Sequence, residues 1–240
     1  MRNSQEDSED FLALKRAVTA FKDAETLFFD GRKLHTAAPA LIQDAYRQSN
    51  LSLPVTRQKY YSWNHAETNF VHVESTVGFD GKDLTTLFIK NREGIWDVYQ
   101  TLVCEVSAIF KHDELMGMFP FFRFFSALEY PYELSVDTSH SSEEHLVIKG
   151  HLSAKPPQCQ EDIASEFSYT ISKGTGHLCS LYEKTFKSKS CELVLDTVEI
   201  NGPVDESLFQ LPDKQKITVS NLPDYMNVRM KEWGRTMLAG

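Results

Sequence analysis

Three histidines close together in the 240-residue chain, His140, His145 and His151, are the first candidates for binding a metal. His145 and His151 would share one face of a strand, but Lys149 lies between them on that face. The sequence contains no HExxH motif and no clustered carboxylates that would complete a zinc site. We therefore interpret these histidines as solvent-facing side chains and predict neither a metal site nor a cofactor.

Other catalytic patterns are equally incomplete. Gly174-Thr175-Gly176 resembles a phosphate-binding loop but lacks the GK[ST] sequence and a following helix, so a hairpin turn explains it. There is no GxSxG elbow, and no cysteine has a base at an informative spacing. Acidic pairs such as Glu143 and Glu144 lie among polar residues, as exposed charges do. The sequence predicts a protein that is not an enzyme.

The cysteines leave two alternatives open. None of them has the CxxC spacing of a zinc or thioredoxin-like site. An even count allows one or two disulfides in an oxidising compartment, and buried free thiols are the equal alternative. The four residues are Cys104, Cys159, Cys179 and Cys191.

A phenylalanine-rich segment, residues 113–129, is too apolar to be left in water at about 25 cal/mol per Å². One interpretation is a core helix packed on a sheet. The other is a mobile plug in an apolar cavity, because Pro120 interrupts a continuous helix and methionines beside phenylalanines suit surfaces that repack. As a lid, the segment would contribute Leu115, Met118, Phe119, Phe121, Phe122 and Phe125 to a ligand site.

Aromatic residues on the expected strands could line the same site. Trp63, Phe70 and Trp96 are the candidates for an apolar pocket wall, and ordinary core packing is the alternative. The supply of apolar side chains exceeds what one thin sheet needs, which favours the pocket.

Composition excludes several classes of function. The net charge of −9 and the absence of a basic patch argue against a nucleic-acid partner. No apolar run approaches the ~18–20 residues of a membrane span. The first ten residues lack the apolar core of a signal peptide, so the chain is either cytosolic or has lost its leader.

Hydrophobic periodicity predicts helices first and strands afterwards. Residues 9–24 repeat apolar side chains at helical spacing after a polar tail at 1–8, and residues 39–49 predict a second helix. Residues 26–37 fit either a strand or a continued helix. From residue 55 the period becomes two.

The strand predictions share a two-residue alternation and turn signals at their ends. Residues 95–106 read as one long strand with Trp96, Cys104 and Val106 on one face. The predicted last elements are a strand at 216–219 and a short helix at 225–238. The remaining predicted strands are 57–63, 67–77, 84–90, 132–137, 144–152, 166–172, 177–187 and 191–200.

Without a linker or a repeat, we expect one domain over residues 9–240. Eight to ten antiparallel strands joined by short turns favour a curled sheet or barrel of the α+β class.

The order of these elements resembles the outer-membrane lipoprotein carrier and sorting proteins, the LolA/LolB-like superfamily. The resemblance covers residues 9–220. It rests on the turn Phe79-Asp80-Gly81-Lys82, the strand Ile95-Trp96-Asp97-Val98-Tyr99, the apolar interruption and the closing phrase Val204–Pro212.

The resemblance implies a strongly curved antiparallel half-barrel, an unclosed barrel, with the N-terminal helix and an apolar helical lid on its concave face. It also implies an acyl-chain cavity and periplasmic lipoprotein trafficking. Three features depart from the family: Arg57 is the nearest match to the arginine that latches the carrier lid, segment 26–53 is long, and no leader or lipid-anchoring cysteine is present.

We carry three functional hypotheses. The first is a monomeric periplasmic protein that binds a lipid or an acylated lipoprotein. The second is an interaction or sensor module on the same scaffold that recognises a protein partner. The third is a cytosolic enzyme of unrecognised type.

Overall fold

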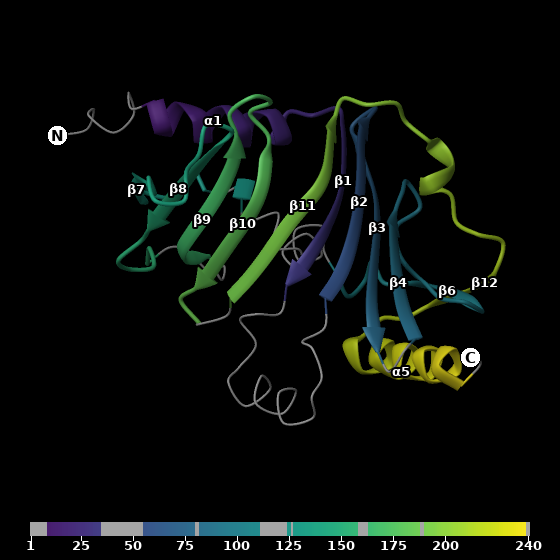
Figure 1. Ribbon diagram of the computed structural model, residues 1–240. Coiled ribbons are helices and arrows are strands. Elements are labelled where there is room, and N and C mark those ends of the chain that lie inside the picture. Colours follow the sequence, from purple (N-terminus) through teal and green to yellow (C-terminus); the bar gives the residue numbers. More distant parts are fainter. Residues whose placement is uncertain are drawn as a thin grey trace. The chain divides into compact units, whose positions relative to one another are not determined.

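The computed structural model describes residues 9–34, 55–79, 82–110, 124–125, 127–157, 163–187 and 190–238. Its elements follow one another from an N-terminal helix through twelve strands to a C-terminal helix (Figure 1). They are α1 (Glu9–Lys22), β1 (Thr26–Leu34), β2 (Val55–His65), β3 (Thr68–Phe79), β4 (Lys82–Lys90), β5 (Ile95–Val98), β6 (Leu102–Glu105), β7 (Glu133–Val136), β8 (His145–His151), β9 (Ala164–Ser172), β10 (Leu178–Thr185), β11 (Ser190–Ile200), the 3₁₀ helix η1 (Glu206–Phe209), β12 (Gln215–Thr218) and α5 (Leu222–Leu238).

The described strands form one sheet in the order β12-β6-β5-β4-β3-β2-β1-β11-β10-β9-β8-β7. Strands β12 and β7 end this order, so the sheet is open. Strand β12 runs parallel to β6, whereas every other pair with an assigned register is antiparallel. The α+β, unclosed half-barrel class predicted from the sequence is confirmed. The predicted apolar lid falls on residues outside the described ranges, except for Phe125 and its neighbours.

The chain groups into two compact units, which we describe separately. Unit 1 comprises residues 1–23, 32–53 and 119–198, and unit 2 comprises residues 24–31, 54–118 and 199–240. The single domain over 9–240 stays a prediction.

In unit 1, the N-terminal helix α1 forms where the sequence predicts it. Leu14, Ala17, Val18 and Phe21 recur at i, i+3, i+4 and i+7 and are at most 3% exposed. This apolar stripe packs on β7 and β9.

Aromatic rings connect α1 to the strands of unit 1. Phe124 packs edge-on against Phe21 at 5.7 Å and against Tyr169 at 5.1 Å. Tyr169 stacks on Phe167 at 4.1 Å, and Tyr132 meets Phe167 edge-on at 4.9 Å. Burial of these rings stabilises unit 1 because each aromatic side chain removes a large apolar area from water.

In unit 2, the strands predicted at 57–63, 67–77 and 84–90 are confirmed as β2, β3 and β4. The ambiguous segment after α1 is a strand, β1, and not a continued helix. The helix predicted at 39–49 lies outside the described residues.

The long strand predicted at 95–106 is wrong. It is a hairpin of β5 and β6, closed where the Tyr99 N–H donates to the Leu102 carbonyl. The polar pair Gln100 and Thr101 forms the turn, and local periodicity does not reveal it. Because Asp97 is the partner of Cys104 and Val98 of Val103, Cys104 lies on the face opposite Trp96.

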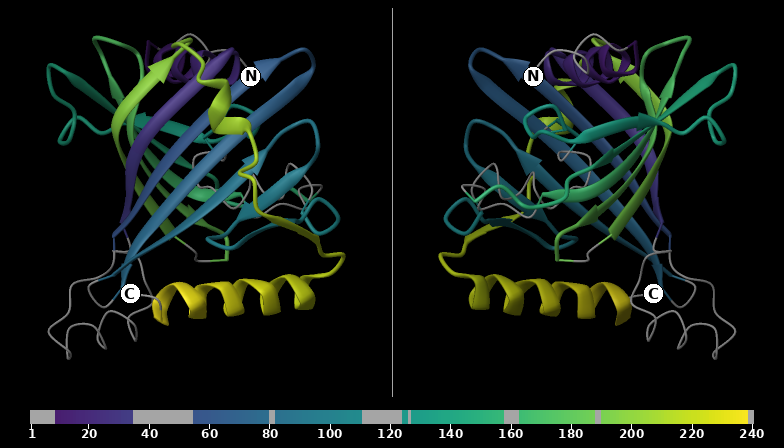
Figure 2. Two further views of the ribbon diagram at one scale, coloured as in Figure 1. Left: turned by 90° about the vertical axis from the view of Figure 1, so that its right-hand side faces the viewer. Right: turned by 90° about the vertical axis from the view of Figure 1, so that its left-hand side faces the viewer.

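The C-terminal helix of unit 2 begins at Leu222, three residues earlier than predicted. It packs against β4 (Figures 1 and 2). Neither described helix meets the length and hydropathy that a membrane-crossing helix requires.

Gly150 on β8 offers a test of packing in unit 1. A Cβ added there would lie 2.2 Å from the Phe167 ring, which is itself stacked on Tyr169. We expect Gly150→Ala to lower the free energy of unfolding by about 1–3 kcal/mol, measured by urea denaturation. Gly174→Ala is the control, because the nearest atom there lies 3.9 Å away. Equal effects of the two substitutions would contradict this account.

Candidate functional site

Strand register in unit 2 brings the three predicted pocket aromatics to one sheet face. Trp63 on β2 is the direct partner of Phe70 on β3. Two residues along β3, His72 pairs with Ile89 on β4, and Ile89 pairs with Trp96 on β5. Directly paired residues point to the same side of a sheet, and so do residues two apart. Trp63, Phe70 and Trp96 therefore share a face.

Phe209, at the end of η1, completes an aromatic cluster on this face. The rings of Trp63 and Phe70 stack at 5.0 Å, and the Phe209 ring lies 6.1 Å from Trp63 and 5.7 Å from Phe70. Phe70 and Phe209 are 8% and 6% exposed. Such spacings are typical of favourable aromatic pairs.

Two side chains hold the segment around Phe209 against the sheet. The His72 Nδ1 lies 2.7 Å from the Leu208 carbonyl oxygen, which assigns the proton to Nδ1. The Asn91 amide donates to the Phe209 carbonyl at 3.2 Å. Because carbonyl groups of an irregular segment need donors when they are partly buried, these bonds fix η1 in place.

Asp205 caps the N-terminus of η1. The Asp205 carboxylate accepts from the Ser207 N–H at 3.0 Å and from its hydroxyl at 2.6 Å. The hydroxyl hydrogen bond lowers the pKa of Asp205 from its ordinary value. An Asp at this position favours the turn for the same reason that it favours helix N-termini.

A groove runs beside the aromatic cluster, with a volume of about 530 Å³. We call it the aromatic groove. It is lined by Trp63, His65, Phe70, Asn91, Arg92, Glu93, Glu206, Phe209, Gln210, Leu211 and Lys216. Its volume lies within the range of about 300–1,000 Å³ that small-molecule sites occupy.

Cationic groups lie at the edge of the aromatic groove. The Arg92 guanidinium lies 5.9 Å from the centre of the Phe70 ring, and no carboxylate of the described residues forms an ion pair with it. The Lys216 Nζ lies 5.3 Å from the Trp96 ring centre and 3.2 Å from Glu93 Oε2. Trp96 itself belongs to a buried apolar cluster with Ile89, Val98 and Val103, against which Leu211 packs.

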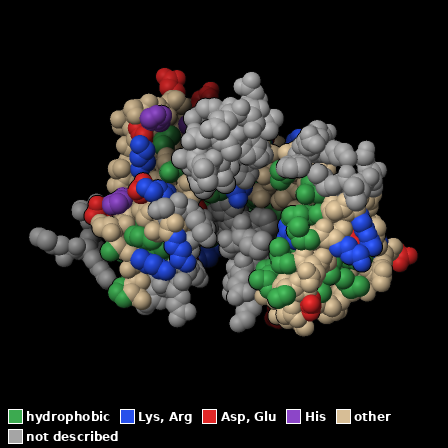
Figure 3. All heavy atoms as spheres, turned by 90° about the horizontal axis from the view of Figure 1, so that it is seen from below, with side chains coloured by type: hydrophobic (Ala, Val, Ile, Leu, Met, Phe, Trp, Pro, Cys, Tyr) green, Lys and Arg blue, Asp and Glu red, His purple; other side chains and the backbone are tan. Residues whose placement is uncertain are grey.

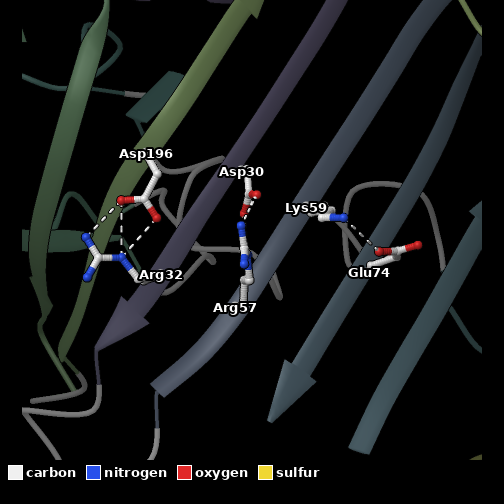
Figure 4. Close-up of polar contacts among 6 residues, drawn as sticks. All are labelled: Asp30, Arg32, Arg57, Lys59, Glu74 and Asp196. Atoms are coloured by element: carbon white, nitrogen blue, oxygen red, sulfur yellow. Dashed lines mark hydrogen bonds and ion pairs between the residues drawn. The ribbon is translucent and has the colours of Figure 1, made fainter. Parts of the chain in front are cut away.

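The same face of β2 becomes charged toward its first residues. Arg57 donates two hydrogen bonds to Asp30, at 3.0 and 2.6 Å, and Lys59 lies 3.9 Å from Glu74 (Figure 4). The hydrogen bond from Arg57 holds the pKa of Asp30 below its ordinary value. Arg57, the loose match to a lid-latching arginine, is therefore paired with Asp30 on β1.

Unit 1 contains a comparable bidentate pair. Arg32 donates to both carboxylate oxygens of Asp196, with donor–acceptor distances of 2.8–3.2 Å (Figure 4).

The predicted site residues thus fall into three groups. Trp63 and Phe70 line the aromatic groove, and Trp96 lies on the same face beneath Lys216. Phe125 is described in unit 1, with its ring 6.4 Å from that of Phe124. Outside the described residues lie Leu115, Met118, Phe119, Phe121 and Phe122, so their role as a lid stays a prediction.

Sequence reasoning missed Phe209, Arg92 and Lys216. The first lies in the closing phrase that supported the family resemblance, but nothing local connects it to Trp63. Arg92 lies in the turn between the strands predicted at 84–90 and 95–106, where a charged residue is ordinary.

Cys104 and Cys179 are free thiols, Cys191 is buried, and Cys159 lies outside the described residues. Burial raises the pKa of Cys104 to about 11, which keeps the thiol protonated at neutral pH. Among the described residues, no three His, Cys, Asp or Glu side chains are close enough to hold a metal ion.

Comparison with known proteins finds similarity at the level of the fold. No family model and no curated protein matches the sequence. A chain of the Pseudomonas aeruginosa MucA/MucB complex has a TM-score of 0.42 and 13% identity, and the match covers 88% of this chain and 64% of that one. This chain therefore spans less than two thirds of that relative's length.

Two further structures are matched over nearly their whole length. A DUF1329 family protein from Desulfovibrio piger has a TM-score of 0.38 and 9% identity, over 83% of this chain and 96% of that one. A domain from Vibrio parahaemolyticus named for outer membrane lipoprotein sorting has a TM-score of 0.31 and 8% identity, over 84% and 97%.

The Asp30–Arg57 pair predicts a pH dependence of stability. Because pairing lowers the pKa of Asp30, its contribution is present above the ordinary value of 3.8 and is lost as the pH falls through the lowered value. We expect Asp30→Asn to lower the free energy of unfolding by about 1 kcal/mol at pH 7, since Arg57 is largely exposed, with a shrinking difference below pH 4.

Urea denaturation at several pH values measures this effect. Glu129→Gln, which removes the exposed pair of Glu129 with Lys22, is the control and should change the free energy of unfolding by less than about 0.5 kcal/mol. A cost of Asp30→Asn that is the same at pH 3 and pH 7 would disprove the assignment.

Proposed function

We propose that the protein binds the acyl chain of a lipid or a lipoprotein in the aromatic groove and catalyses no reaction. The observation that carries the proposal is the cluster of Trp63, Phe70 and Phe209 beside a groove of about 530 Å³. The half-buried Trp63 offers its ring to a ligand, and Phe70 and Phe209, which are 8% and 6% exposed, pack against it. We propose the periplasm as the compartment in which the protein acts.

The expected affinity follows from apolar burial. Each methylene that leaves water contributes about 0.8 kcal/mol, so ten methylenes contribute about 8 kcal/mol before the cost of association. A free energy of that size corresponds to a dissociation constant of about 1 μM at best. Such affinity suits a protein that must also release its ligand.

Charges beside the groove would orient the ligand. Arg92, which forms no ion pair with the described carboxylates, and Lys216, which Glu93 partly neutralises, could attract a phosphate or carboxylate next to the acyl chain. The acyl chain would then lie along the rings and its polar end toward these cations.

The phenylalanine-rich segment is the proposed lid. Its residues Leu115, Met118, Phe119, Phe121, Phe122 and Phe125 would leave an apolar cavity when a ligand enters, as the family resemblance implies. This part of the proposal rests on the sequence.

Displacement of an environment-sensitive apolar dye tests the binding. An acylated peptide should displace the dye, and the same peptide without its acyl chain should not. Trp63→Ala should weaken the acylated peptide about tenfold, because it removes one wall of the groove. Tyr130→Ala, which replaces a half-buried aromatic residue of unit 1, is the matched control and should bind as the unmodified protein does.

The other outcomes separate the alternatives. Loss of displacement in Phe122→Asp and Phe125→Asp but not in Trp63→Ala would place the acyl chain under the lid instead of in the aromatic groove. Equal binding of the acylated and unacylated peptides would favour the interaction module that recognises a protein partner. Absence of dye uptake would mean that the aromatic residues serve only the core.

A further inference from the structure

The segment between β11 and η1 closes a small pocket over the sheet of unit 2. After β11 the chain passes the start of β1 and the end of β2 before it reaches η1 (Figure 1). The Thr26 hydroxyl donates to the Gly202 carbonyl at 2.9 Å, and the Asn201 N–H donates to the Thr26 carbonyl at 2.8 Å. These hydrogen bonds hold the segment beside β1.

The enclosed space, which we call the β1 pocket, has a volume of about 30 Å³. Its walls include the rings of Phe28, Tyr61 and Trp63, and its charged groups are Glu199 and Asp205. None of the described residues that line it is Lys, Arg or His. A single water molecule needs about 10–15 Å³, so the pocket accepts a small head group and not a chain.

The aromatic walls of the β1 pocket are suited to a cation. Phe28 and Tyr61 stack with ring centres 4.5 Å apart, and Trp63 follows Tyr61 by two residues on the same face of β2. All three side chains are half-buried, so part of each ring stays open to a ligand. The face of an aromatic ring carries partial negative charge and attracts ammonium groups.

Two carboxylates reach the pocket without a cation to neutralise them. Asp205 uses Oδ1 for both hydrogen bonds from Ser207, and none of the described residues donates to its Oδ2. Glu199 forms no hydrogen bond or ion pair with a described residue. A Cβ added at Gly202 would lie 3.3 Å from Glu199 Oε2, which places this carboxylate against the segment that carries Asp205.

The Tyr61 hydroxyl reports the charge around the pocket. Burial raises the pKa of Tyr61, and the next causes are four carboxylates, Glu199 and Asp205 among them. The other two, Asp30 and Glu74, have basic partners (Figure 4). The carboxylates that lack partners are therefore those of the pocket, and the potential they create favours a positive charge there.

We propose that the β1 pocket binds a primary ammonium group, and that the acyl ligand of the aromatic groove carries such an amine. The second half of this inference rests on the proposed function. Trp63 and Phe209 line both the pocket and the groove, so one ligand can place its chain on one side of these rings and its amine on the other. Arg92 and Lys216 line the groove but not the pocket, so the ammonium does not meet them.

Size and hydrogen bonding select a primary ammonium among organic cations. An –NH₃⁺ group has three N–H donors, which match the acceptors of Glu199 and Asp205. A guanidinium or trimethylammonium group has four heavy atoms and exceeds a volume of about 30 Å³. Because both carboxylates lie near the surface, added salt should weaken the contact.

Dye displacement by decylammonium and by decanol, which share a ten-carbon chain, tests the inference. Decylammonium should displace the dye at about tenfold lower concentration. In the double variant Glu199→Gln, Asp205→Asn this ratio should fall below about twofold. Asparagine still caps a helix, and decanol is the internal reference for any change in the groove.

The acidic protein attracts any amine to some extent, so the control must match the change in charge. The double variant Glu143→Gln, Glu144→Gln removes two exposed carboxylates of unit 1 and should keep the tenfold ratio.

The helix α5 carries a second hydrophobic surface that a decyl chain could contact. Its Leu222, Met226 and Met230 are 52%, 43% and 63% exposed. Figure 3 views the molecule from below, where hydrophobic side chains gather beside Lys and Arg side chains. An alkyl chain bound there would lie beside cations, which repel an ammonium group. A preference for decylammonium therefore points to the β1 pocket.

A short amine tests the pocket without an acyl chain. Butylammonium chloride should shift the amide NMR signals of Gly202 and Ser207 in the unmodified chain, and butanol should not. The shifts should disappear in Glu199→Gln, Asp205→Asn. This measurement separates failure of the pocket from failure of the proposed function.

The outcomes divide as follows. Equal displacement by decylammonium and decanol, without shifts from butylammonium, would overturn the inference and leave acyl binding in place. A preference that survives in Glu199→Gln, Asp205→Asn, or that both double variants lose equally, would assign it to the net charge of the protein. Displacement by neither compound, with shifts from butylammonium, would overturn the proposed function and retain the pocket as an ammonium site.

Discussion

The register of the antiparallel strands β2 to β5 determines which side chains of unit 2 can meet. Trp63 faces Phe70, and two residues along β3 the next pair leads from His72 through Ile89 to Trp96. A shift of one residue in any of these pairings would move the side chains on one side of that pairing to the other face of the sheet. The aromatic groove, the attachment of η1 through His72 and the buried cluster around Trp96 all depend on this register.

The two-residue alternation of apolar side chains predicted most strands. It did not predict which face of the sheet a residue occupies after a turn. Residues 95–106 alternate as one strand would, and that interpretation put Trp96 and Cys104 on one face. The turn at Gln100 and Thr101 reverses the chain, and the pairing of Asp97 with Cys104 then puts Cys104 opposite Trp96. The information that fixes the turn is the closing hydrogen bond from Tyr99 to Leu102, which a hydrophobic pattern does not contain.

The sequence likewise predicted only part of the candidate site. Trp63, Phe70 and Trp96 could be recognised because large aromatic side chains on strands must pack or line a pocket. Phe209 could not, since it reaches the site through contacts between residues more than one hundred positions apart, such as that of Asn91 with the Phe209 carbonyl. The order of elements and the closing phrase were the basis of the resemblance to the lipoprotein carriers, whereas the side-chain contacts of that phrase required coordinates.

The polar anchoring of α5 has an energetic consequence for its outward face. A helix held by apolar burial must turn its hydrophobic residues inward, which would remove Leu222, Met226 and Met230 from the surface. Hydrogen bonds from Thr101 and to Asp97 remove that requirement, although Asp97 Oδ1 and Arg229 Nε have no hydrogen-bond partner among the described residues. Each such buried group costs about 1–3 kcal/mol. A cost of that size lowers the free energy with which α5 is held to the rest of unit 2.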